Sequence, residues 1–104
     1  VSSLECYKCS NNHNNWMDCT RDKVECKPFQ DACTSFVSFH SKLFICLGEK
    51  WHNISKGCDT MERCEYRANV VNQPLCDRSS YNEWACVECC TGDLCNYFVT
   101  VSAS

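Results

Sequence analysis

The chain has 104 residues, 13 of them cysteine, and its 10 Lys and Arg against 13 Asp and Glu leave a net charge of −3. Cysteine at this density in a short chain predicts a disulfide-stapled domain from an oxidising compartment. The mixed charge, without a basic stripe, argues against nucleic acid as a partner, and no apolar run is long enough for a transmembrane helix.

The first half of the chain predicts three short strands. Residues 4–9 (LECYKC) alternate along the strand, and residues 32–40 (ACTSFVSFH) are rich in β-branched and aromatic side chains. Both patterns favour strands. Residues 52–58 are expected to return antiparallel to the second of these strands. Long connections are expected over residues 10–18 and 41–51.

The second half of the chain predicts one further strand, at residues 83–89 (EWACVEC), where the side chains alternate between two faces. No stretch shows a convincing helical repeat. Residues 59–67 are compatible with a short helical turn, and residues 65–82 are expected to form a long connection. Short strands, long connections and many cysteines together predict a small disulfide-rich all-β fold.

The two ends of the chain carry paired cysteine motifs. Residues 4–9 read Leu-x-Cys-Tyr-x-Cys, and residues 89–96 read Cys-Cys-x4-Cys-Asn. This pattern resembles the lymphocyte-antigen-6/urokinase-receptor (Ly-6/uPAR, or LU) domains, the cell-surface relatives of snake three-finger toxins, over residues 4–96. The resemblance implies a three-finger, snake-toxin-like fold in a single domain over residues 1–96, with a cysteine knot-like base and three extended loops. A tail would follow at residues 97–104.

The resemblance also implies how the cysteines pair. Five bridges belong to the family framework, and a sixth matches family members that bridge their third finger. The six pairs are Cys6–Cys33, Cys9–Cys19, Cys26–Cys58, Cys64–Cys89, Cys76–Cys86 and Cys90–Cys95. The fingers would carry residues 10–18, 34–57 and 65–88. In this family Asn96 supports the base through hydrogen bonds from its side chain to the backbone, which is a structural role.

Cys46 has no partner in that framework, because the number of cysteines is odd. Three explanations remain open. Cys46 forms a bridge to a second copy and so makes a covalent homodimer, or it is a buried, inert thiol among apolar neighbours. Alternatively it pairs with Cys76 or Cys86, which leaves a different sulfur unpaired.

The second finger is the candidate contact surface, because its tip carries an apolar run that an aromatic residue closely follows. Exposed apolar clusters often mark partner or membrane contacts, and aromatic side chains are frequent binding hot spots. The candidate contact residues are Leu43, Phe44, Ile45, Leu47 and Trp51 and, in the first loop, Trp16. The alternative is that the long finger folds over and packs these side chains on the sheet, and that Trp16 packs against its neighbouring disulfide.

Neither catalysis nor metal or cofactor binding is predicted. Residues 6–9 and 86–89 have the Cys-x-x-Cys spacing of zinc sites, but two such pairs would account for only four of the sulfurs. The three histidines are separated in the sequence and have no matching carboxylate spacing, so no acid–base geometry is indicated.

Two modifications are predicted. Asn53 opens the N-glycosylation sequon Asn-Ile-Ser, which suits a secreted or cell-surface protein. The small residues of the tail, with Ser102 and Ser104 as candidates, resemble a glycolipid (GPI) attachment site. Membrane association is therefore expected through a lipid anchor, with secretion as the alternative. The first residues, 1–4, resemble a mature start after signal cleavage.

The resemblance implies a binding function. We expect a cell-surface module that modulates or co-binds a membrane receptor or ion channel, of the acetylcholine-receptor type or a signalling receptor, through its finger loops. The alternatives are a cell-adhesion or structural protein acting between cells, a secreted toxin-like ligand, and an activin-type receptor ectodomain, which shares the fold and a similar terminal motif.

Overall fold

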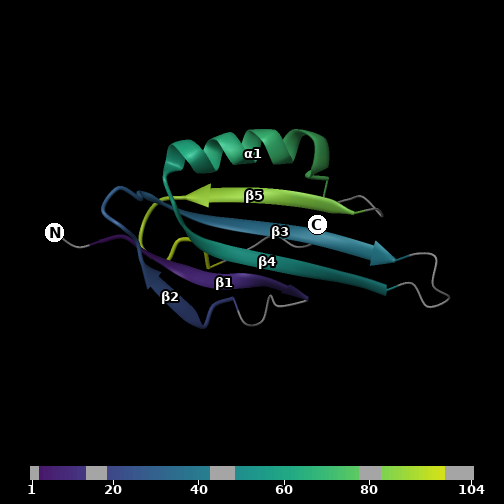
Figure 1. Cartoon of the computed structure of the whole chain (residues 1–104), viewed down its shortest axis with the longest axis horizontal. Coiled ribbons are helices and arrows are strands. Elements are labelled where there is room, and N and C mark those ends of the chain that lie inside the picture. Colours follow the sequence, from purple (N-terminus) through teal and green to yellow (C-terminus); the bar gives the residue numbers. More distant parts are fainter. Residues whose placement is uncertain (1–2, 14–18, 43–48, 78–82, 98–104) are drawn as a thin grey trace.

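The structure is a computed structural model, and it describes residues 3–13, 19–42, 49–77 and 83–97. Its elements, in chain order, are β1 (Glu5–His13), β2 (Asp22–Glu25), β3 (Ala32–Lys42), β4 (Glu49–Asp59), α1 (Met61–Leu75) and β5 (Trp84–Cys90). The five strands form one antiparallel sheet in the order β2-β1-β4-β3-β5 (Figure 1). This fold confirms the predicted class, a small disulfide-rich antiparallel sheet compatible with the three-finger architecture.

The central hairpin of the sheet is formed by β3 and β4, which pair over their whole length from Ala32↔Asp59 to Lys42↔Glu49. The β-branched and aromatic residues of β3 suit a strand that is paired on both sides, by β4 and by β5. The connection expected over residues 41–51 is therefore wrong at both ends, because β3 continues to Lys42 and β4 begins at Glu49. Likewise β1 runs to His13, into the connection expected over residues 10–18.

Strand β2 was not among the predicted elements. Its four residues, Asp22 to Glu25, contain one apolar side chain, Val24, and three of the four positions are exposed. Such a segment has no alternating apolar pattern, and it becomes a strand because β1 offers it a paired edge from Glu5 to Lys8.

The core is small and largely made of sulfur. One cluster joins Val37, Ile54 and Trp84 to the buried sulfurs of Cys19 and Cys86. A second cluster, nearer the chain start, consists of three buried cysteines, Cys6, Cys26 and Cys33. Disulfide sulfurs thus occupy the positions that apolar side chains fill in an ordinary core, as expected for a disulfide-rich small domain.

The helix α1 corrects the prediction of a long connection over residues 65–82. It begins at Met61, after the N-cap Thr60, whose side-chain oxygen accepts a hydrogen bond from the backbone N–H of Arg63. Two further donors of the first turn are satisfied, since Asp59 accepts from the Thr60 N–H at 2.8 Å and Asp31 accepts from the Met61 N–H at 2.8 Å. Such side-chain acceptors stabilise a helix start.

The short helical turn compatible with residues 59–67 is present as the first part of α1, but the continuation to Leu75 is not predicted, because the sequence encodes it weakly. Cys64 is its single buried residue, so there is no repeating apolar stripe for a core to cover. Pro74 lies in the last turn, and a proline there removes a backbone donor. Disulfides and side-chain hydrogen bonds to β5 hold the helix in place. Within the described residues, no helix is long and apolar enough to cross a membrane.

Candidate functional site

Six disulfides join the elements, and their pairs coincide with those that the family resemblance implies. They are Cys6–Cys33, Cys9–Cys19, Cys26–Cys58, Cys64–Cys89, Cys76–Cys86 and Cys90–Cys95. The Cα atoms of each pair lie 4.7 to 6.0 Å apart, within the normal range for a disulfide. Cys46, the one cysteine that belongs to none of these six pairs, lies outside the described residues.

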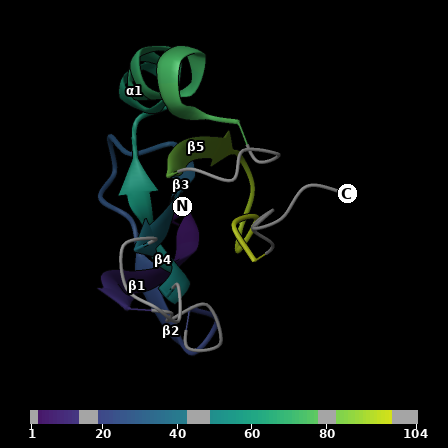
Figure 2. The same cartoon turned by 90° about the vertical axis from the view of Figure 1, so that its right-hand side faces the viewer.

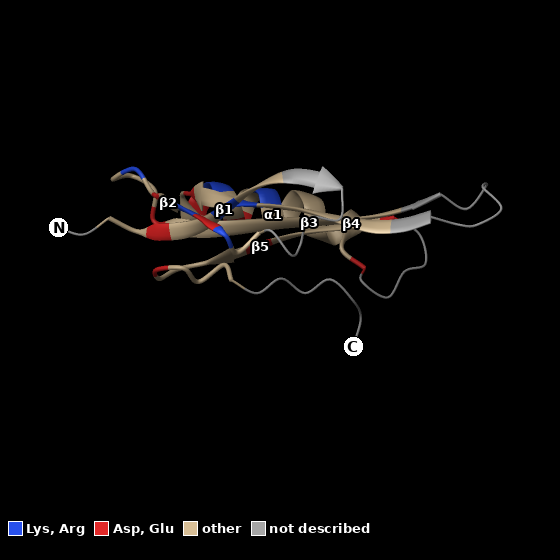
Figure 3. Cartoon of the chain, turned by 90° about the horizontal axis from the view of Figure 1, so that it is seen from below, with Lys and Arg blue, Asp and Glu red and all other residues tan. Residues whose placement is uncertain are grey.

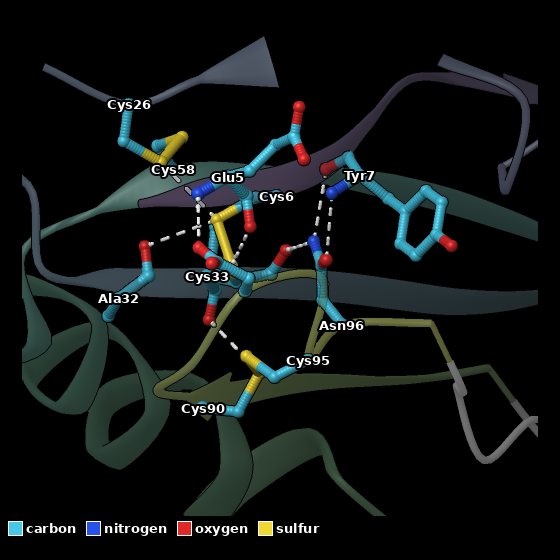
Figure 4. The surroundings of a disulfide bond; sticks show 12 residues. Glu5, Cys6, Tyr7, Cys26, Ala32, Cys33, Cys58, Cys90, Cys95 and Asn96 are labelled. Carbon is cyan, nitrogen blue, oxygen red and sulfur yellow. Dashed lines mark hydrogen bonds between the residues drawn. A yellow bond between two sulfur atoms is a disulfide. The ribbon is translucent and has the colours of Figure 1, made fainter. Parts of the chain in front are cut away.

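The base of the molecule is stabilised by the side chain of Asn96, which is 2% exposed (Figure 4). Its Oδ1 accepts from the Tyr7 N–H at 2.9 Å, and its Nδ2 donates to the Tyr7 carbonyl at 3.0 Å and to the Thr34 carbonyl at 3.2 Å. One amide thus satisfies backbone groups of both β1 and β3, which fits the structural role expected for this residue.

The turn that leads to Asn96 also pairs with the start of β1. The Glu5 N–H donates to Asp93 Oδ1 at 3.0 Å, and the Glu5 carbonyl accepts from the Leu94 N–H at 2.7 Å. Gly92 and Leu94 have positive φ angles of 105° and 56°, a region that glycine enters freely and leucine rarely does. The chain end is therefore bonded to the sheet through backbone and side-chain hydrogen bonds as well as through sulfur.

Lys56 on β4 is a buried basic residue with a shifted pKa. Its side chain is buried on β4, where its Nζ donates to the Tyr97 carbonyl at 2.7 Å and lies 5.9 Å from the centre of the Tyr7 ring. Burial lowers the pKa of the Lys56 amine below its ordinary value, and the negative charge of Glu88 partly opposes this shift. Lys56 therefore ties the described end of the chain to the sheet.

Disulfides tether α1 at both of its ends. Cys64, in the first two turns, is bonded to Cys89, and Cys76, the C-cap, is bonded to Cys86. Both partners are on β5, an edge strand of the sheet. Viewed along the long axis of the molecule, α1 lies beyond β5, at the edge of the sheet opposite β2 (Figure 2).

Asn72 joins the last turn of α1 to the same strand. Its Nδ2 donates to the Val87 carbonyl at 3.0 Å, and its Oδ1 accepts from the Val87 N–H at 2.8 Å. The amide thus reproduces the pair of hydrogen bonds that a neighbouring strand would make with Val87. Exposed strand edges are templates for unwanted pairing, and covering them with a helix is one way in which proteins avoid it.

A groove opens between the end of α1 and the strands β3, β4 and β5. We call it the aromatic groove, and its volume is about 360 Å³. Its walls include Phe36, Ser38, His40, Asn53, Leu75 and Trp84. Mostly apolar walls with a few polar groups are typical of sites that hold small molecules or side groups.

Two aromatic stacks flank this groove. His40 and Trp51, opposite each other on β3 and β4, stack with ring centres 5.2 Å apart and planes at 19°. Phe39 stacks on Trp84 at 5.8 Å, and on its other neighbouring strand it contacts His52 at 5.0 Å. The predicted contact residue Trp51 is therefore half-buried, and His40 covers one face of its ring.

Two arrangements in the described residues have the composition of chemical sites but not their geometry. Ser38 Oγ lies 2.9 Å from His40 Nε2, yet no carboxylate in the described part of the chain is bonded to that histidine to orient it, as a nucleophilic site requires. The sulfurs of Cys6, Cys26 and Cys58 lie within 4.8 Å of one another. All three are bonded in disulfides, so none is available as the thiolate that a metal needs.

The sequence of the chain is similar to that of a known protein. No family model matches the chain. The chain is 38% identical over 104 residues to the UPAR/Ly6 domain-containing protein cold of Drosophila melanogaster, and the matched region covers 99% of this chain and 68% of the relative. The chain belongs to the UPAR/Ly6 domain family. As a UPAR/Ly6 domain it is an extracellular or cell-surface module, and this family consists in general of binding domains without catalytic activity.

Several residues predicted to matter in this UPAR/Ly6 domain lie outside the described residues. They are Trp16 in the first loop, Leu43, Phe44, Ile45, Cys46 and Leu47 in the second finger, and Ser102 and Ser104 in the tail. Among the contact candidates, Trp51 is described. Asn53 is also described, on β4, where it is half-buried and lines the aromatic groove.

The surface that sequence reasoning missed is the outer face of α1. Tyr66 and Val70, one helical turn apart, are 71% and 56% exposed, which is unusual for large apolar side chains on one helix face. Arg63 and Arg67 stand beside them, and both approach the carboxylate of Asp59, at 3.8 and 3.6 Å. The Tyr-x-x-x-Val spacing of these residues places both side chains on one face of a helix. It does not indicate a surface when residues 65–82 are expected to form a connection.

Charges in the described part of the UPAR/Ly6 domain are of both signs. Figure 3 shows Lys and Arg interspersed with Asp and Glu around β2 and α1, with no continuous stripe of one sign. Long-range electrostatic steering of a highly charged partner is therefore not a property of the described surface.

Proposed function

We propose that this UPAR/Ly6 domain co-binds or modulates a membrane receptor or ion channel through its second finger, the β3–β4 hairpin. The observation that supports the proposal is the hairpin itself. It has two strands of 11 residues paired in unbroken register, and these strands run along the long axis of the molecule in Figure 1. A preformed element loses little conformational entropy on binding, so more of its contact energy is available as affinity.

The side chains that the hairpin carries suit such a contact. Its strands lead into residues 43–48, whose sequence holds the apolar run Leu-Phe-Ile-Cys-Leu, and Trp51 stands two positions after the start of β4. Aromatic and aliphatic anchors of this kind dominate the energy of many interfaces. By resemblance, channels of the acetylcholine-receptor type and signalling receptors are the partners to test first.

Co-expression with such channels tests this proposal. The native protein should change the agonist-evoked current. Phe44→Asp should raise the protein concentration needed for half of that effect by about 30-fold, which corresponds to the loss of about 2 kcal/mol expected for a hot spot. Tyr66→Asp on α1 is the matched control, since it makes the same kind of change away from the hairpin. Equal losses from both variants, or an undiminished effect of Phe44→Asp, would contradict the role of the second finger.

Adhesion between cells is the second candidate, and the exposed α1 face is the observation that favours it. An elongated domain of 55 × 28 × 21 Å with a hairpin along its long axis and an apolar helix face along one edge offers two separate contact surfaces. If adhesion is the function, cells carrying the native protein should cluster, and Tyr66→Asp should abolish the clustering. Clustering that survives this change would exclude α1 as the adhesive surface.

We propose also that the chain is held at the membrane by a glycolipid near Ser102 or Ser104, and that Cys46 decides whether it forms a covalent dimer. The first point rests on the small residues of the tail and the second on the odd number of cysteines. Phospholipase treatment of native cells should release the protein into the medium. A non-reducing gel should show a dimer band that Cys46→Ser removes, and a single monomer band from the native protein would exclude the covalent dimer.

A further inference from the structure

We infer that a glycan on Asn53 folds back into the aromatic groove, so that its first sugar packs against β3 and the end of α1 and stabilises the domain. This inference goes beyond the proposed function and does not depend on it. It rests on where β-sheet register places the sequon and on the chemistry of the groove walls.

The pairing register of β3 and β4 places Asn53 at the groove. Asn53 lies on β4 directly opposite Ser38 of β3, and both residues line the groove. Its diagonal neighbours on the same face of β3 are Phe36 and His40, because side chains two positions apart point to the same side of a sheet. In an antiparallel pair such diagonal neighbours are about 7–8 Å apart, a distance that one sugar ring linked to Asn53 Nδ2 can span.

The walls of the groove combine apolar and polar side chains that suit a sugar. A pyranose ring presents C–H groups on its faces and hydroxyl groups at its rim, so it packs on apolar and aromatic surfaces while its rim bonds to polar groups. The groove offers the ring of Phe36 and the side chain of Leu75 for the faces, and the Ser38 hydroxyl and the Glu83 carboxylate for the rim. Its volume of about 360 Å³ is near the lower end of the range for small-molecule sites, which suits one or two sugars rather than a long ligand.

Covalent attachment to Asn53 allows a sugar to occupy even a shallow groove. A sugar linked to Asn53 is held beside the groove at a high effective concentration, so even a weak contact is formed most of the time. Leu75, half exposed without the sugar, would lose apolar surface to it, and removal of apolar surface from water is favourable. The glycan would cover the face of the sheet beside α1 and leave the outer side of Tyr66 and Val70 open.

The test compares glycoforms of the secreted protein by calorimetry. Ser55→Ala removes the sequon but keeps Asn53, and Ser55→Thr keeps the sequon as the matched control. Relative to native protein, Ser55→Ala should lower the Tm by about 3–6 °C, whereas Ser55→Thr should not. Endoglycosidase trimming to a single N-acetylglucosamine should preserve the native Tm, because the first sugar makes the contact. A loss of Tm on trimming would overturn the inference, as would an intact mass that shows no sugar at Asn53.

Contact with the groove is separated from a general effect of glycans by two further variants. Phe36→Ala should reduce or abolish the difference in Tm between glycosylated and unglycosylated protein, and Leu75→Ala, at a half-exposed site that tolerates truncation, should act in the same direction. Moving the glycan to Asn69 on the outer side of α1, with Val71→Thr in the Ser55→Ala background, should not restore the Tm. Full restoration from Asn69, or a difference in Tm that both groove variants leave unchanged, would overturn the inference.

Discussion

Substitution of Asn72 by leucine tests whether the helix α1 is bonded to the sheet edge through one side chain. Leucine has nearly the same size as asparagine and cannot donate or accept a hydrogen bond. The variant loses two bonds, of 3.0 and 2.8 Å, and leaves the N–H and carbonyl of Val87, a residue that is 3% exposed, without these partners.

The expected loss of stability follows from those two bonds. Each contributes about 1 kcal/mol net, and the stranded backbone groups of Val87 add roughly 1–2 kcal/mol of uncompensated burial. Leucine favours helix more than asparagine does by a few tenths of a kcal/mol, which offsets a small part. We therefore expect the free energy of unfolding to fall by about 3 kcal/mol. The disulfides at both ends of α1 remain, so the variant should still fold.

Equilibrium unfolding in guanidinium chloride, with the disulfides intact, measures this loss. Hydrogen exchange gives a local readout, because the Val87 amide should exchange faster in the variant while its neighbours in the β3–β5 ladder keep their protection. Asn69→Leu is the matched control, since Asn69 is on the exposed side of the same helix and its replacement should be neutral or slightly stabilising. A loss below about 0.5 kcal/mol for Asn72→Leu, the size of an ordinary surface change, would refute the reasoning, as would unchanged exchange at Val87.

Two other predictions concern the base of the molecule. Asn96→Ala removes three hydrogen bonds from a buried position and should reduce the free energy of unfolding by about 3–4 kcal/mol in the same denaturant assay; a loss as small as that of Asn69→Ala would exclude the anchoring role. Lys56, whose pKa is lowered in the folded protein mainly by burial, predicts a pH dependence. Between that lowered pKa and the ordinary value of 10.5, the unfolded chain binds more protons than the folded chain, so stability should rise with pH across this window. Lys56→Met, compared with the native residue in a Cys46→Ser background that prevents disulfide exchange through Cys46, should lack the rise, and equal pH profiles would contradict the assignment.

The fold class and the cysteine pairs could be predicted because the motifs at the two ends of the chain resemble those of a known family, and the resemblance implies the pairing. A spacing such as Cys-Tyr-x-Cys at residues 6–9, or Cys-Asn at residues 95–96, is readable without knowing what lies beside it in space. The strand over residues 32–40 was predicted for a similar reason, since its β-branched and aromatic residues favour extended backbone whichever strand pairs with it.

Strand ends and the helix could not be read in this way. β3 and β4 extend each other to Lys42 and Glu49 because pairing continues, and β2 forms because β1 offers an edge. Neither effect is visible in the residues themselves. The same holds for the aromatic groove, whose walls come from residues on β3, β4, β5 and α1 that are far apart in the sequence.

The sequence by itself determined that this chain is a disulfide-stapled UPAR/Ly6 domain, because its sulfurs and their spacing carry that information along the chain. Only the tertiary structure decided that residues 61–75 form a helix, since one buried side chain cannot specify one. The helix is held to β5 by Cys64 in its first turn, by Asn72 in its last turn and by Cys76 at its C-cap. Register alone, in turn, places Asn53 in the groove at the end of that helix.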